Sequence, residues 1–187
     1  MKTNIKLIFG CLLAVSLATV AYGCKGKASN TDNATDTVAT AKPVGPTFNA
    51  DSAYAFTAAQ CDFGPRVMNS TAHDKCGKWI VEKFKEYGCD VQEQKADLKA
   101  YDGTVLKATN IIARFNPEAK KRILICAHWD SRPWADNDPD STNHKKPVMA
   151  ANDGASGVAV MLELARQLQA DKKLKVGVDF VCFDAED

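Results

Sequence analysis

Five side chains of metal-binding type stand at the ends of apolar segments in the second half of the chain. They are His128, Asp130, Asp153, Glu186 and Asp187. Imidazole and carboxylate groups are ligands that suit zinc, and a catalytic zinc keeps one coordination position open for water or substrate. The adjacent pair Glu186 and Asp187 also permits a division of labour, in which one carboxylate binds metal and the other moves protons. These residue types therefore predict a catalytic metal site.

Two apolar runs of strand length, residues 122–127 and 176–183, carry four of these residues at their carboxyl ends. Buried parallel strands have this pattern. Ligands of open α/β sheets bind outside the carboxyl ends of the strands. We therefore expect the two strand ends to meet the Gly-rich turn that contains Asp153.

An amphipathic helix is predicted directly after Asp153. Its apolar side chains recur at helical spacing, while Glu163, Arg166 and Gln167 take the polar face. The apolar positions are Val158, Met161, Leu162, Ala165 and Leu168. Each motif taken alone also has an ordinary structural explanation as a strand end, a turn or a solvated acidic pair. Their order and their strand and helix contexts together favour the metal site.

Three motifs resemble those of the glutaminyl-peptide cyclotransferases (glutaminyl cyclases) of Bacteroidetes type, which are related to the zinc aminopeptidases with co-catalytic metals. The motifs are His128-Trp-Asp130-Ser-Arg, Ala151-Asn-Asp153-Gly-Ala-Ser-Gly157 and Phe183-Asp-Ala-Glu186-Asp187. Gly64-Pro-Arg66 is similar to the segment that opens the domain of these cyclases. The resemblance thus covers residues 52–187.

The resemblance implies a role for each site residue. Asp153 and Asp187 match zinc ligands, and Glu186 matches the general acid and base. His128 and Asp130 match a pair that lines a single-zinc site in the cyclases and serves a second metal in the aminopeptidases. The family continues beyond the Glu-Asp pair with elements that supply a distal histidine ligand. No histidine here is a candidate for it, so we expect a site and a sheet that are incomplete on the C-terminal side, and doubtful activity for a fragment ending there.

The reaction that the resemblance implies is zinc-dependent conversion of an N-terminal glutamine to pyroglutamate with release of ammonia. Its partners would be peptides or proteins that begin with glutamine. The residue sequence of 130–138 and the Glu-Asp pair favour this aminoacyltransferase over a zinc aminopeptidase. The aminopeptidase would use two zinc ions and cut the first peptide bond. A second alternative is a non-catalytic, peptide-binding lipoprotein.

The amino-terminal residues have the pattern of an export signal. Residues 1–23 combine a positive start with a short apolar core, and Cys24 follows as in bacterial lipoprotein signals. Residues 24–47 are polar and predict a disordered tether. We expect an exported protein, periplasmic or anchored in the outer membrane through a lipid on Cys24. The net charge of +1 gives no indication of nucleic-acid binding.

The remaining residues, 48–187, are predicted to form one α/β domain with a mixed, largely parallel sheet flanked by helices. Helices are expected over residues 52–60 and 71–87, the second with a capping box at Thr71. The alternating segments 89–98 and 109–115 are expected to be edge strands.

Two further features of this domain stay open from sequence. Trp134, in the long loop of residues 131–149, either lines a substrate pocket or packs the loop down. Cys126 and Cys182 fit buried strand positions, whereas Cys61 could pair with Cys76 or Cys89.

Overall fold

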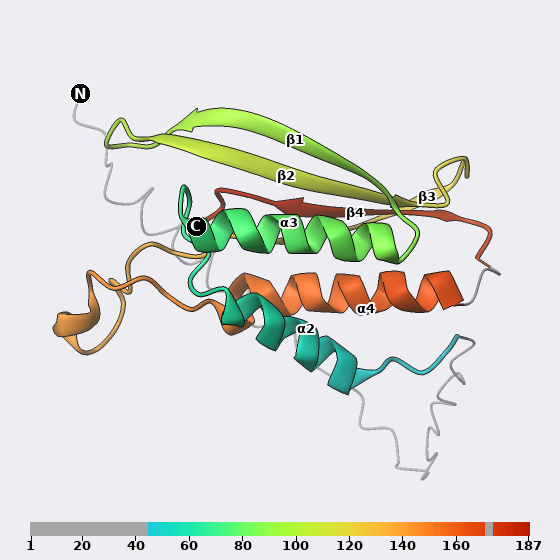
Figure 1. Cartoon of the computed structure of the whole chain (residues 1–187), viewed down its shortest axis with the longest axis horizontal. Helices are drawn as coiled ribbons and strands as arrows, with labels where there is room; N and C mark the ends of the chain where they lie inside the picture. The colour runs from blue at the N-terminus through green and yellow to red at the C-terminus, as the bar shows by residue number, and fades with distance from the viewer. Residues whose placement is uncertain (1–44, 171–173) are drawn as a thin grey trace, which may run out of the picture. The chain divides into compact units, whose positions relative to one another are not determined.

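The structure is a computed structural model that describes residues 45–170 and 174–187. The predicted signal, lipidation site and most of the tether lie outside these residues. The described part contains a four-stranded sheet and three helices, two of which pack on the sheet while the first packs against the third (Figure 1). The helices are α2 (Ala50–Asp62), α3 (Thr71–Glu86) and α4 (Gly157–Ala170), and the strands are β1 (Asp90–Lys99), β2 (Val105–Phe115), β3 (Arg122–His128) and β4 (Gly177–Phe183). No described helix is long and apolar enough to cross a membrane.

The strand order is β1-β2-β4-β3. A tight hairpin joins β1 to β2, so these neighbours run antiparallel, and β2 is also antiparallel to β4. Only β3 and β4 are parallel, because the chain between them crosses over through α4. The predicted α/β fold and its mixed sheet flanked by helices are confirmed. The expected predominance of parallel strands is wrong for the described sheet, where two of three pairings are antiparallel.

The alternating pattern of β2 reflects one covered face and not an edge position. Ile111 and Ala113 point into the core, while β1 and β4 pair with both sides of the strand. The expectation that residues 109–115 form an edge strand is therefore wrong, although β1 does lie at an edge. Antiparallel sheets with one open face show this alternation at internal strands too.

The core lies between the sheet and helices α3 and α4, which run side by side along one face (Figure 1). Its fully buried members include Ile80, Phe84, Ile111, Leu162 and Phe180. Phe84 of α3 and Phe180 of β4 meet with ring centroids 5.4 Å apart. Burying side chains of this size contributes about 1.5–3 kcal/mol each, so this layer supplies most of the stability.

The N-cap of helix α3 lies one residue earlier than predicted. Ser70 has extended backbone angles, and its hydroxyl oxygen accepts a hydrogen bond from the amide of His73. Thr71 is the first helical residue and not the cap, because the serine before it already satisfies the free amide. The helix ends as predicted, since Gly88 takes a φ of +77°, which favours glycine.

The cysteines divide differently from the prediction. Cys182 is buried on the core face of β4, as expected. Cys126 is exposed, because it lies on β3, the other edge of the described sheet, on the face away from the helices. Cys61, Cys76 and Cys89 are free thiols among the described residues, and burial raises the pKa of Cys76 and of Cys89 to about 12.

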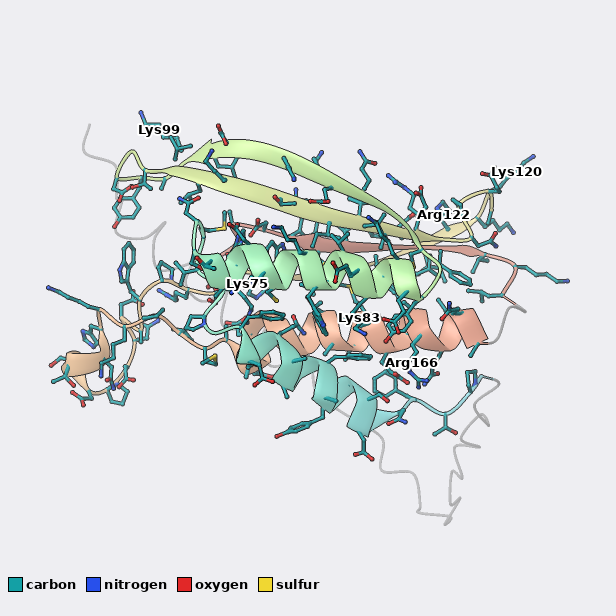
Figure 2. The ribbon with its side chains drawn as sticks, viewed as in Figure 1. Lys75, Lys83, Lys99, Lys120, Arg122 and Arg166 are labelled. Atoms are coloured by element: carbon teal, nitrogen blue, oxygen red, sulfur yellow. The ribbon has the colours of Figure 1, made fainter. Side chains whose placement is uncertain are left out.

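Glu163 is buried in α4, although its spacing placed it on the polar face. Its side chain is 0% exposed and accepts hydrogen bonds from the Arg166 guanidinium, the Gln167 amide and the backbone amide of Asn49. Asn49 in turn caps α2 through its side chain, which accepts from the amide of Ser52. The carboxylate therefore fastens the start of α2 to α4. Figure 2 labels Arg166 on α4.

Replacing Glu163 with glutamine should destabilise the fold. We expect Glu163→Gln to lower the free energy of unfolding by about 1–2 kcal/mol at neutral pH, because hydrogen bonds to a charged group are the stronger ones. The hydrogen bond from Arg166 is the main reason that the pKa of Glu163 lies below its ordinary value. This stabilisation is therefore present above the ordinary glutamate pKa of about 4.3 and is lost as the pH falls through the lower folded value.

Urea unfolding near pH 7 and again near pH 3 measures this difference. Glu82→Gln, on the exposed face of α3, is the matched control and should change the unfolding free energy little at either pH. Equal destabilisation by the two variants at neutral pH would contradict the role of Glu163.

Candidate metal centre

The carboxyl ends of β3 and β4 meet, as the sequence predicts. The two strands are parallel with His128 opposite Phe183, and the amide of Trp129 donates to the Phe183 carbonyl at 3.0 Å. This register carries the residues after each strand to the same end of the sheet. Asp130 and the Glu186-Asp187 pair therefore become neighbours.

Three potential ligands converge at this end. One ligand atom each from His128, Asp153 and Asp187 lies within 4.8 Å of the others. The Nε2 atom of His128 is 2.9 Å from Oδ1 of Asp153, whose side chain is exposed. The structure thus brings both predicted zinc ligands, Asp153 and Asp187, to the histidine. Their metal-binding roles stay predictions.

The carboxylate of Asp130 holds the pair that follows β4. It is fully buried, and its two oxygens accept backbone hydrogen bonds from the amides of Glu186, at 3.3 Å, and Asp187, at 3.1 Å. Burial raises the pKa of Asp130, while these two amide bonds act in the opposite direction. Its Oδ1 also lies 3.5 Å from Nδ1 of His128. Asp130 therefore positions the acidic pair through hydrogen bonds and lies close to the histidine ring without a hydrogen bond to it.

The charge balance of this cluster fits a bound cation. Burial, together with the nearby carboxylates of Asp130, Asp153 and Glu186, raises the pKa of Asp187. Burial acts against the charged form of His128, but its hydrogen bond to Asp153 and the surrounding acids outweigh this and raise its pKa. Crowded carboxylates and a neighbouring imidazole are the donor set that zinc prefers. The residues present therefore fit the metal that the sequence predicts.

Glu186 lies beside the cluster with its side chain free to reach a substrate. The side chain is 61% exposed, and Oε2 is 3.8 Å from Nδ1 of His128. That nitrogen is buried without a hydrogen-bond partner in the described residues. Glu186, the predicted general acid and base, thus lies at the edge of the cluster, next to the three potential ligands but separate from them.

The turn that carries Asp153 packs directly beneath His128. Residues 151–156 form one helical turn in which Asp153 itself is not helical, with φ −107° and ψ 94°. A β-carbon at Gly154 would overlap the backbone oxygen of His128 and come within 2.9 Å of its ring. Glycine is therefore needed here for the close approach of the turn to the histidine.

Arg66 connects the two halves of the site, a role that the sequence did not reveal. Its side chain is fully buried and donates to the carbonyls of Trp129, Met149 and Ala150 at 2.8–3.2 Å. Its own carbonyl accepts from the amide of Ser131. The guanidinium thereby fixes the end of β3 against the start of the Asp153 turn. Its only sequence signal was the Gly64-Pro-Arg66 motif of the resemblance.

A buried histidine–aspartate pair supports the other strand end. The Nε2 atom of His73 lies 2.9 Å from Oδ1 of Asp184, and the Asp184 carboxylate also accepts from the amides of Thr109 and Ala185. The His73 ring stacks on Trp129 with centroids 4.2 Å apart. His73 therefore contributes to the site through Asp184, from a helix far upstream, and sequence spacing gave no sign of it.

The remaining predicted residue, Trp134, lies near the cluster but outside it. Its side chain is 44% exposed and lines a hollow to which Asp187 also contributes. Two backbone hydrogen bonds hold the long loop that carries it, from the Ala135 amide to the Lys146 carbonyl and from the Val148 amide to the Arg132 carbonyl. Its function in the substrate pocket stays a prediction.

Comparison with known proteins confirms the resemblance found in the sequence. Residues 110–187 match the family model described as Peptidase family M28. The solved glutaminyl cyclase of Bacteroides thetaiotaomicron, bound to N-acetylhistamine, is 53% identical with a TM-score of 0.74, over 76% of this chain and 48% of that chain. A Zn-dependent exopeptidase from Parabacteroides distasonis is 52% identical with the same TM-score and the same coverage.

A curated relative gives the same indication. The glutaminyl-peptide cyclotransferase of Drosophila melanogaster is 28% identical over 127 residues, which are 66% of this chain and 33% of that protein. The chain thus spans about half the length of the solved structures and about a third of the curated relative. It is similar to the glutaminyl cyclases and to the related zinc exopeptidases in both sequence and fold.

Gly154→Ala tests whether the packing beneath His128 is needed for metal binding. The added methyl group must push the histidine away from Asp153 and Asp187, so we expect zinc affinity to fall at least about tenfold, as for changes to groups that orient ligands. Titration calorimetry with zinc measures the loss. Gly45→Ala is the matched control, because a β-carbon at Gly45 meets nothing within 4 Å. Unchanged zinc affinity in Gly154→Ala would remove His128 from the ligand set.

Proposed function

We propose that this chain, similar in fold and sequence to solved glutaminyl cyclases, serves zinc-dependent cyclisation of N-terminal glutamine in peptides or proteins. The observation that carries the proposal is the convergence of His128, Asp153 and Asp187 beside the exposed carboxylate of Glu186. In this reaction the α-amine of glutamine attacks its own side-chain carboxamide carbon. The bond to the carboxamide nitrogen breaks, and ammonia leaves as the pyroglutamate ring closes.

Asp153 and Asp187 would hold the zinc, with His128 at the same cluster. A bound zinc ion acts as a Lewis acid that polarises a carbonyl group. Asp130 keeps the backbone of Glu186 and Asp187 in place through its two hydrogen bonds. Gly154 lets the Asp153 turn approach the histidine closely enough for the three side chains to meet.

Glu186 would carry the proton between the two nitrogen atoms. Its carboxylate accepts the proton that the attacking α-amine loses, and it then gives that proton to the departing carboxamide nitrogen. Its exposed position at the rim leaves it free to contact the substrate. Positioned acid–base groups of this kind accelerate reactions about 10²–10⁴-fold.

A single zinc ion per site is part of the proposal. Asp130 lies outside the ligand cluster, and both of its oxygens already accept backbone amides. A second metal at Asp130 would have to use the lone pairs that these two hydrogen bonds leave free. The zinc aminopeptidase is the alternative, favoured by the similarity to a Zn-dependent exopeptidase. In that reaction Glu186 would deprotonate water instead of an amine.

The setting of the reaction is also a proposal. The sequence pattern at residues 1–24 supports export and lipid attachment at Cys24, which would place the domain in the periplasm or on the outer membrane. Peptides that begin with glutamine would be the substrates in either place.

Ammonia release from a glutamine-initiated peptide tests the function. We expect the purified full-length protein to release ammonia without shortening the peptide, and a zinc chelator to abolish the release. Glu186→Gln should lower the rate at least about a hundredfold, because the substituted amide cannot carry the proton. Glu82→Gln, an exposed glutamate on α3, should leave the rate unchanged.

Mass spectrometry of the peptide separates the alternatives. Loss of the intact first amino acid would establish the aminopeptidase and overturn the cyclase. A metal-free protein that binds the peptide and leaves it unaltered would identify the non-catalytic module.

A further inference from the structure

An apolar hollow lies directly beside the candidate metal centre and has no part in the chemistry described so far. It has a volume of about 290 Å³, and Asp187 is one of its lining residues. The apolar lining comes from three separate segments of the chain. Its members are Val67, Met68, Tyr101, Leu106, Pro133 and Trp134.

The segments that form this hollow are fastened to one another. Asn69 donates to the carbonyl of Val105 and accepts from the amide of Lys107, which ties the segment after Arg66 to the start of β2. Two hydrogen bonds close the tip of the β1–β2 hairpin. The Ala100 amide donates to the Thr104 carbonyl, and the Asp102 carboxylate accepts from the Thr104 amide. The hollow is therefore a formed feature of the fold.

The hollow opens towards the reacting groups. A second depression shares Tyr101, Pro133, Trp134 and Asp187 with it and extends to Glu186. A peptide whose first residue lies at the metal cluster would therefore pass its second residue over this lining. The volume is at the lower limit of ordinary ligand pockets, so it suits one side chain better than a longer segment.

We propose that this hollow, here called the second-residue pocket, binds the side chain of the residue after the N-terminal glutamine and selects aromatic or large aliphatic residues there. This inference rests on the proposed peptide reaction at the adjacent centre. Burial of an apolar side chain against Trp134 and Tyr101 supplies the preference. Acidic residues at this position are disfavoured, because Asp102 and Asp187 lie at the same lining.

The test compares three peptide amides that differ only in the second residue: glutaminyl-phenylalanine, glutaminyl-glycine and glutaminyl-glutamate. We expect kcat/KM for the phenylalanine peptide to exceed that for the glycine peptide about tenfold or more, with the glutamate peptide lowest. Tyr101→Ala and Trp134→Ala should each reduce the phenylalanine-to-glycine ratio several-fold. Tyr54→Ala removes an aromatic side chain from α2 that is 78% exposed and lies outside the pocket lining, and it should leave the ratio unchanged.

A binding measurement separates this inference from the proposed reaction. Titration calorimetry with pyroglutamyl-phenylalanine amide and pyroglutamyl-glycine amide, in the presence of chelator, needs no turnover. Tighter binding of the phenylalanine compound that is lost in Tyr101→Ala and Trp134→Ala supports the pocket even if no ammonia is released from any peptide. Equal binding of the two compounds, or a preference that survives both substitutions, overturns it.

Discussion

The buried carboxylate of Asp130 accepts the two backbone amides that follow β4, and the candidate centre is assembled around this contact. Burying a carboxylate away from water costs free energy unless hydrogen bonds satisfy its oxygens. The amides of Glu186 and Asp187 supply these bonds to Asp130, and the same bonds fix the backbone of the two residues. The same side chain lies 3.5 Å from the ring of His128. One buried acid thus holds the acidic pair that follows β4 and lies beside the histidine at the end of β3.

The supporting residues follow the same physical rule. Arg66 donates to three backbone carbonyls, and Asp184 accepts two backbone amides together with the ring of His73. Each is a charged or polar side chain that satisfies main-chain groups left free where a strand or turn ends. The irregular backbone at the end of the sheet is therefore held by side chains from elsewhere in the chain. Rigid support of this kind is what a metal centre needs in order to keep its ligands within reach.

Local patterns predicted most of this architecture, and long-range contacts account for what they missed. The apolar runs located β3 and β4, and the helical spacing of Val158, Met161 and Leu162 identified the buried face of α4. Glu163 has the spacing of an exposed residue, yet it is buried because Asn49, 114 residues earlier, supplies a backbone amide. Arg66 and His73 were likewise unpredictable as supports, since their partners lie in distant segments. The alternation of β2 predicts an edge strand wrongly, because alternation reports one covered face and cannot report how many strands are adjacent.

The β1–β2 hairpin places its tip beside the metal cluster while its strands are fixed by register to the rest of the sheet. Because side chains alternate with a period of two, lengthening both strands by two residues each would move the tip and keep every inward-facing residue inward. Such an insertion would leave the chemistry of the β3 and β4 ends untouched. The fold therefore allows the surface beside the candidate centre to change without rebuilding the centre itself.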